Sequence, residues 1–329
     1  LIEAMAWAVL DRIRQGEPVI VISTEDEVEP QSYLLEPILP EDEPTIIYGL
    51  GGSGKSLFAL TCSMIIQLPW TEAKERLDMI VKKRKGVLYL DWESNYKTIT
   101  RRMKALRTGM GMPYVSLHYR ACAIPLADDC EAIRRAIMDN DIGFVVIDSV
   151  AAACGGDLNA AEPALRMFAA LRELKVTSLI VAHTSKNPAT KESTVYGSGF
   201  FNFYARSVWE MKKRQEPGQR GLHCGLYHRK VNDSEEFAPR GLTVTWNQDR
   251  TETRMETCQI MEFATDKSIS VKIIEALLSA GKLNVKQLAI VCGTTDATIR
   301  DTLAMLKEGG KVAAERDGKS NLWFAVHNV

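Results

Sequence analysis

The feature that most constrains the fold is the stretch IIYGLGGSGKSLF at residues 46–58. An apolar run ends abruptly there in a segment of Gly and Ser, and a lone Lys and a Ser follow. Such a segment is not expected in a packed core, because glycine has no side chain to bury and leaves the backbone free to adopt many conformations. The chain is therefore predicted to pass from a short buried strand at 45–49, through a turn of exposed backbone, into a helix that begins at Lys55.

The spacing Gly49-x-x-x-x-Gly54-Lys55-Ser56 fits the P-loop pattern, and it lies between a strand and a helix as that pattern requires. The backbone N–H groups of a P-loop turn inward to hold phosphates, and the positive end of the helix dipole lies beneath them. We expect Lys55 to neutralise the β- and γ-phosphates and the Ser56 hydroxyl to bind Mg²⁺. The predicted triphosphate-binding residues are Gly49, Gly51, Gly52, Ser53, Gly54, Lys55, Ser56 and Leu57.

Hydrolysis also requires a second metal ligand and a base. Asp148 ends the apolar strand GFVVID, the position of a Walker B aspartate, and is expected to hold Mg²⁺ through water. Asp91 and Glu93 end the strand at 86–92, which we expect beside the P-loop strand. Alternation along a strand points both carboxylates to one face, so spacing does not decide which of them polarises water and which caps the next helix.

Strands and helices alternate through the middle of the chain. Continuous Val, Ile and Leu runs separated by helical segments are typical of a parallel sheet that is covered on both faces. Beyond residue 205, short strand-like segments follow one another without a helix, which indicates an antiparallel extension of the sheet. The predicted fold class is α/β. The expected parallel strands are 45–49, 86–92, 116–120, 143–149 and 177–183.

Composition excludes several classes of protein. The net charge of −1 argues against a uniformly basic nucleic-acid binder. No apolar run approaches the ~18 residues of a membrane-spanning helix, so no membrane partner is expected. The seven cysteines are scattered without a CxxC pair, as is typical of reduced thiols in a cytoplasmic protein.

The chain divides into three predicted parts. Residues 1–36 read as an N-terminal helix, at 2–15, and an acidic linker that contains two proline-marked stretches. Residues 37–264 form the α/β domain, and residues 267–329 form a separate small domain.

The α/β domain resembles a known family over about residues 37–262. The P-loop is followed, in order, by LYLDWE with TRRMKAL, VVIDS, GGDLNAAEP, LIVAHTSK and GSG. This ordered set resembles the RecA-like ATPases of the plasmid replicative helicase RepA type, which are relatives of the DnaB-like hexameric helicases. The resemblance implies a RecA-like core that binds ATP and Mg²⁺, assembles into a ring, most often a hexamer, and acts on single-stranded DNA.

The resemblance also implies roles for individual residues. Glu93 matches the acidic residue that activates water, and His183 matches a polar sensor of the γ-phosphate. The alternative for His183 is a histidine at a strand end that only makes hydrogen bonds within the protein. A cation from the neighbouring subunit would complete each site, and Arg229 and Lys230 lie at about the expected place. Arg206 is a further candidate for this cation. The alternative for all three residues is that each is only a solvated surface charge.

Two loops would face the centre of such a ring. The loop at 184–199 carries Lys186 and Lys191, which suit a phosphate backbone and are indifferent to base sequence. Tyr196 is its only stacking candidate. The loop at 152–161 carries an aspartate and no cation, which argues against DNA binding by this loop. Flexible polar loops without a ligand are the alternative.

The C-terminal domain reads as a winged helix-turn-helix. Three amphipathic segments precede a hairpin whose turn lies at Asp317-Gly318, and the domain holds nine Lys/Arg against six Asp/Glu. DNA contact would fall to Arg300 on the recognition helix and to Arg316 and Lys319 on the wing. One strong cation on that helix is meagre for reading a major groove, so a protein-docking role competes with DNA binding.

Three functions remain open from the sequence. The first is an ATP-driven ring that translocates on single-stranded DNA and unwinds duplex during replication of a plasmid, phage or other mobile element. The second is an ATP-dependent loader or switch whose winged domain recruits a replication protein. The third is a DNA-binding regulator in which the ATPase core tunes only oligomerisation.

Overall fold

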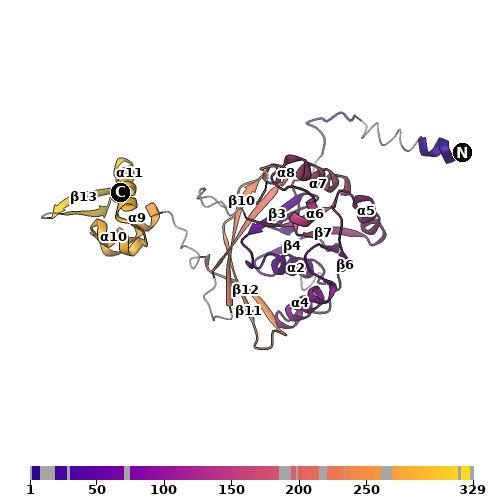
Figure 1. The fold of residues 1–329 in the computed structure, drawn as a ribbon, viewed down its shortest axis with the longest axis horizontal. Helices are drawn as coiled ribbons and strands as arrows, with labels where there is room; N and C mark the ends of the chain where they lie inside the picture. The colour runs from indigo at the N-terminus through magenta and orange to yellow at the C-terminus, as the bar shows by residue number, and fades with distance from the viewer. Residues whose placement is uncertain are drawn as a thin grey trace.

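A nine-stranded mixed sheet forms the centre of the computed structural model (Figure 1). Its strands lie in the order β12-β11-β10-β9-β3-β8-β7-β5-β6. The structure describes residues 2–7, 19–27, 30–69, 75–184, 194–197, 199–214, 221–232, 234–260, 269–317 and 320–326.

The strands from β9 to β6 in this order run parallel, which confirms the five predicted parallel strands. The expectation that all strands beyond residue 205 are antiparallel is wrong for β9, which pairs with β3 in parallel. Their bounds are β3 Pro44–Gly49, β5 Gly86–Asp91, β6 His118–Ala121, β7 Ile142–Asp148, β8 Thr177–His183 and β9 Ser207–Arg214. The prediction that β5 lies beside the P-loop strand β3 is wrong, because β8 and β7 lie between them. Central strands that are buried on both faces have similar apolar runs, so the sequence carries no signal for their lateral order.

The predicted antiparallel extension is also present. The strand β10 (Gly221–Val231) pairs with β9, and β11 (Arg240–Trp246) and β12 (Thr253–Cys258) follow as successive hairpin partners. The core is therefore an α/β sheet, parallel in the middle and antiparallel at one side.

Helices cover both faces of the parallel part. One face packs against α2 (Lys55–Ile66) and α4 (Tyr96–Gly109). The other face packs against α5 (Cys130–Asp139), α7 (Ala161–Leu174) and the short helices α6 (Val150–Cys154) and α8 (Phe200–Tyr204). Adjacent strand residues alternate between the two cores, as Val145 and Val146 do. This alternation explains why the central strands carry nearly continuous apolar runs rather than alternating polar and apolar residues.

The segment SYLLEPIL at residues 32–39, whose first five residues fall in the predicted linker, belongs to the core instead. It forms β1 (Tyr33–Glu36) and β2 (Leu39–Pro40), and β1 also pairs with β4 (Ile80–Val81). Leu34 and Leu35 are fully buried against the same apolar cluster as α2. The flanking acidic and proline residues obscured this small sheet, and its pairing of β1 with β4 joins segments separated by about 45 residues. The domain boundaries otherwise stay predictions.

At the N-terminus, residues 2–7 are helical, and the remainder of the expected helix lies outside the described residues. None of the helices that the structure describes has the length and hydropathy needed to cross a membrane.

The C-terminal domain has a core of its own and the predicted winged helix-turn-helix fold. It contains α9 (Ile269–Ala280), α10 (Val285–Cys292), α11 (Asp296–Glu308) and the hairpin β13 (Val312–Asp317) with β14 (Ser320–Ala325). Asn284 and Gln287 form a reciprocal capping box at the start of α10, and Thr295 accepts a hydrogen bond from the Thr298 N–H at the start of α11. These caps set where the turn between the two helices falls.

Candidate functional site

The P-loop connects β3 to α2 at the carboxyl edge of the parallel strands. Gly54, the residue before α2, has a φ of 90°, a left-handed conformation that costs other L-residues energy. This turn allows the chain to enter α2 directly, so that the unpaired N–H groups of its first turn lie next to the loop.

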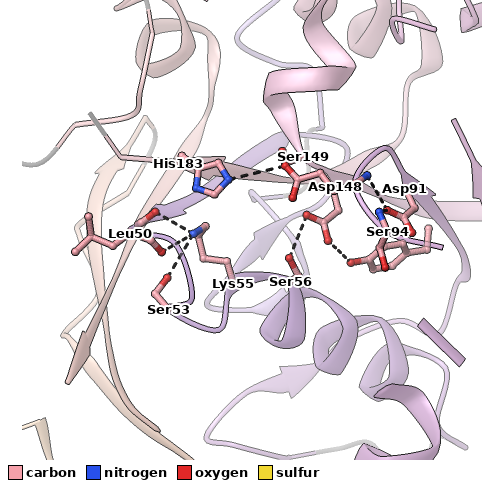
Figure 2. A network of polar contacts seen from close by, with 12 residues as sticks. Leu50, Ser53, Lys55, Ser56, Asp91, Ser94, Asp148, Ser149 and His183 are labelled. Atoms are coloured by element: carbon pink, nitrogen blue, oxygen red, sulfur yellow. Dashed lines mark hydrogen bonds and ion pairs between the residues drawn. The ribbon is translucent and has the colours of Figure 1, made fainter. Parts of the chain in front are cut away.

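Lys55 folds back over the loop and is almost completely buried. Its Nζ atom donates hydrogen bonds to the Gly49 and Leu50 carbonyls, each at 2.9 Å, and to Ser53 Oγ at 3.4 Å (Figure 2). Burial lowers the pKa of Lys55 to about 8, although the carboxylates of Asp148 and Glu93 oppose the shift. The ammonium group is therefore held by weak neutral acceptors, which a polyphosphate can replace.

Asp148 and Ser56 meet at the end of β7. Ser56 Oγ donates to Asp148 Oδ1 at 3.1 Å, and Tyr89 OH donates to Asp148 Oδ2 at 2.7 Å. Burial raises the pKa of Asp148 against the effect of these hydrogen bonds, and burial also raises the pKa of Tyr89. A hydroxyl and a carboxylate side by side are hard oxygen ligands, so the two residues expected to hold Mg²⁺ fit that ion.

The structure separates the two carboxylates that spacing left equivalent. Asp91 is 2% exposed, and its oxygens accept hydrogen bonds from the backbone N–H groups of Glu93 (3.0 Å) and Ser94 (2.8 Å) and from Tyr119 OH (3.0 Å). Burial, aided by Asp91, raises the pKa of Tyr119 to about 12, so this phenol stays a donor. Asp91 is thus fully engaged in shaping the loop that follows β5.

Glu93 instead lines the same cavity as the P-loop. Its Oε1 atom accepts a hydrogen bond from Ser149 Oγ, directly after the Walker B position. His183, at the end of β8, also lines this cavity, and its Nε2 atom lies 3.9 Å from Glu93 Oε1. Five predicted residues therefore come together at the phosphate end of one cavity: Lys55, Ser56, Glu93, Asp148 and His183.

The cavity has a volume of about 480 Å³ and continues beyond the phosphate end. Side chains from α4 and from the β11–β12 hairpin line its other end: Arg101, Arg102, Ala105, Trp246, Arg250 and Thr253. Sequence reasoning missed this end. The arginine pair stands in the segment TRRMKAL, but no local pattern links it to a hairpin that lies about 145 residues later.

Lys213 is a second cation at the P-loop that the sequence did not indicate. It lies on β9, and its Nζ atom donates to the Gly51 carbonyl at 2.8 Å. Lys55 binds the two preceding carbonyls, and the positive charge of Lys213 contributes to lowering the pKa of Lys55. Only the parallel pairing of β9 with β3 brings Lys213 to the loop.

The candidate cations for a neighbouring site do not line this cavity. Arg229 is paired with Glu210, with Nε and Nη2 at 2.9 and 2.6 Å from Oε2. Lys230 donates to the carbonyls of three residues at the end of α8 and beyond, and Arg206 lies 3.6 Å from Glu43. Each therefore has a partner within its own chain, and action on a neighbouring subunit stays a prediction.

The nucleic-acid candidates are only partly described. Lys186, Lys191 and Lys319 lie outside the described residues. Arg300 and Arg316 are exposed on α11 and β13. Tyr196 is 42% exposed and lines a separate hollow beside Leu50, His183 and Lys213.

Two family models match the chain. A family model described as an AAA domain matches residues 11–189, and one described as a DeoR-like helix-turn-helix domain matches residues 270–318. None of the curated proteins matches the chain. Among solved structures, a KaiC-like protein from the hyperthermophilic archaeon Pyrococcus horikoshii OT3 is similar, with 16% identity and a TM-score of 0.45. The match covers 69% of this chain and 94% of that one.

Proposed function

We propose, from the premise that this chain belongs to the AAA domain family, that it hydrolyses ATP to drive a ring-forming motor on single-stranded DNA. The observation that carries the proposal is the meeting of Lys55, Ser56, Glu93, Asp148 and His183 at one end of one cavity. A site that only stored nucleotide would not need a carboxylate beyond the metal ligands, whereas hydrolysis needs one placed to receive a proton.

Glu93 is the base in this proposal. A water molecule attacks the γ-phosphorus, the bond from phosphorus to the bridging oxygen of ADP breaks, and the Glu93 carboxylate accepts the proton of the water. The Ser149 hydroxyl holds the Glu93 carboxylate in place. Lys55 exchanges its carbonyl partners for phosphate oxygens and neutralises charge there. Mg²⁺, held by Ser56 and Asp148, would add electrostatic stabilisation of the phosphates.

His183 couples the chemistry to the following loop. Its ring lies between the Glu93 carboxylate, 3.9 Å away, and the hollow that contains Tyr196. Loss of the γ-phosphate would change the partners of the ring, and the chain directly after β8 would respond. This is the route by which hydrolysis moves a DNA-contacting loop in the proposed motor.

A DNA-binding regulator is the second candidate, and the winged domain favours it. Arg300 and Arg316 are exposed on the recognition helix and the wing. The domain also matches a DeoR-like helix-turn-helix. In this reading ATP controls assembly, and the winged domain binds duplex DNA.

One set of measurements separates the two candidates. The motor requires ATP turnover that rises with single-stranded DNA and strand separation that depends on ATP. The regulator requires duplex binding that Arg300→Ala together with Arg316→Ala abolishes, without strand separation by the parent protein. Mass in solution with a non-hydrolysable ATP analogue tests ring formation in the same samples.

A further inference from the structure

The nucleotide cavity has a second end that is built from parts far apart in the chain. The hairpin β11–β12 lies directly on the end of α4: a Cβ atom at Gly109 would fall 2.3 Å from the Thr253 carbonyl oxygen. Arg254 Nε also donates to the Gly109 carbonyl at 3.2 Å. Backbone therefore packs against backbone at this junction, and the two walls that carry Arg102 and Trp246 are fixed relative to each other.

Three guanidinium groups line the cavity: Arg101, Arg102 and Arg250. The charge of Arg102 also acts on Tyr89, the donor to Asp148. Within the described part of the chain, none of them forms a hydrogen bond or an ion pair. Each guanidinium offers five N–H donors and no acceptor. Trp246 adds a half-buried aromatic ring to the same wall. A planar ring bearing acceptor atoms fits this combination, because it can stack and accept at the same time.

The only carboxylates among the described lining residues, Glu93 and Asp148, belong to the phosphate end. At the other end, the buried hydroxyl of Thr253 is the one side-chain group able to accept a hydrogen bond. The 6-amino group of adenine is a donor, whereas the 6-oxo group and N7 of guanine are acceptors that arginine binds well. The Thr253 hydroxyl can accept from the adenine amino group and can also donate to the guanine 6-oxo group, so no side chain at this end selects adenine over guanine.

We propose that this end binds the base and ribose of a purine nucleoside triphosphate in cis, with the base stacked on Trp246, and that it accepts GTP as well as ATP. The inference rests on the proposed function, since it requires the triphosphate tail to occupy the P-loop. The arginines donate to acceptor atoms of the base and ribose and add attraction for the whole polyanion.

Binding of ATP, GTP and inorganic tripolyphosphate, each with Mg²⁺, to the full chain tests the inference by titration calorimetry. Wild-type protein binds ATP and GTP within about tenfold of each other. Trp246→Ala weakens both nucleotides about 5- to 100-fold, the range found when stacking aromatics are truncated, and leaves tripolyphosphate unchanged. Trp246→Phe restores most of the loss. Unchanged tripolyphosphate binding also shows that the variant is folded.

Arg250→Gln is a second variant, since Arg250 is exposed in the hairpin turn and its loss leaves the core intact. It weakens ATP and GTP alike, and Tyr114→Ala, an exposed aromatic outside the cavity, changes neither. Nucleotide affinity that is unaffected by Trp246→Ala, or a preference for ATP over GTP above 100-fold, overturns the inference while the P-loop site stands. Wild-type protein that binds neither ATP nor tripolyphosphate overturns the proposed function itself.

Discussion

The Nε2 atom of His183 lies 3.9 Å from the Oε1 atom of Glu93, above the P-loop. The two residues come from the ends of β8 and β5, which β7 separates. Parallel strands that end at one edge bring together side chains from across the sheet, as in other α/β folds. The proposed base, Glu93, and the proposed sensor, His183, therefore share one cavity.

Glu93→Gln is expected to lower kcat by about 10²- to 10⁴-fold while ATP still binds, because the amide cannot accept a proton. Asp91→Asn is the matched control. Asp91 accepts three hydrogen bonds away from the cavity, so its variant should lose stability, by about 1–3 kcal/mol, more than turnover. Steady-state ATPase assays and urea unfolding of both variants check this. If Asp91→Asn loses turnover and Glu93→Gln does not, Asp91 is the base and Glu93 is not.

Lys55 gives the site a pH dependence. Its pKa is lowered to about 8 by burial, so the free protein loses the ammonium charge as the pH rises through 8. Binding a triphosphate restores that charge, which costs more at higher pH. The affinity for MgATP is therefore expected to fall up to about tenfold per pH unit above pH 8 and to be constant below pH 7.

Calorimetric titrations between pH 7 and 9.5 measure this dependence. Lys55→Arg is the control, because arginine stays charged throughout this pH range. Whether the variant binds MgATP more or less tightly than the parent, its affinity should not change between pH 7 and 9.5. Lys55→Ala should abolish binding. A wild-type affinity that is flat across pH 8 would contradict the assignment of Lys55 to the phosphates.

Several features of the site follow from local sequence, and others do not. The P-loop and Asp148 each stand in a short pattern whose chemistry requires those residue types at that spacing. Lys213 and Trp246 carry no such pattern. They reach the site only because β9 pairs with β3 and the hairpin folds onto α4, and both are long-range choices. The small sheet that contains Leu35 was missed for the same reason, since its partner Val81 is distant in the chain.

Lys213 should strengthen nucleotide binding from within the same chain. Its Nζ atom donates to the Gly51 carbonyl, next to the carbonyls that Lys55 binds, so both cations lie beside the loop that is expected to hold the phosphates. Because Lys213 is exposed and screened, Lys213→Ala is expected to weaken MgATP only about 3- to 10-fold at low salt. Lys212→Ala, one residue earlier on the opposite face of β9, is the control. Equal losses of MgATP affinity in the two variants would show that Lys213 acts only through the general surface charge and not through its place at the P-loop.

The winged domain should bind DNA through Arg300 and Arg316 if the recognition helix and the wing both contact it. Each contact to phosphate that is lost should lower the slope of log affinity against log salt by about 1. Lys307→Ala, near the other end of α11, is the matched control. Fluorescence anisotropy with duplex and single-stranded DNA at several salt concentrations measures these slopes. Unchanged slopes would favour a protein partner for this domain.

His228 should make the core sensitive to acid. Its ring stacks on Trp209 with centroids 4.2 Å apart, its Nε2 atom lies 3.1 Å from Ser207 Oγ, and its Nδ1 atom accepts from the Phe237 N–H at 3.1 Å. Burial lowers the pKa of His228 to about 4, whereas the unfolded chain titrates near its ordinary value of 6.5. The unfolded state therefore binds the extra proton between these values.

The resulting stability is fully present above pH 6.5 and is lost as the pH falls toward 4, by about 3 kcal/mol in total. Urea unfolding at intervals from pH 4.5 to 7.5 measures the loss. His228→Gln cannot titrate, so this variant should be less stable at pH 7.5 yet have a shallower pH dependence than the parent. Parallel pH profiles for the two proteins would show that other groups cause the acid sensitivity, because only the titration of His228 distinguishes them.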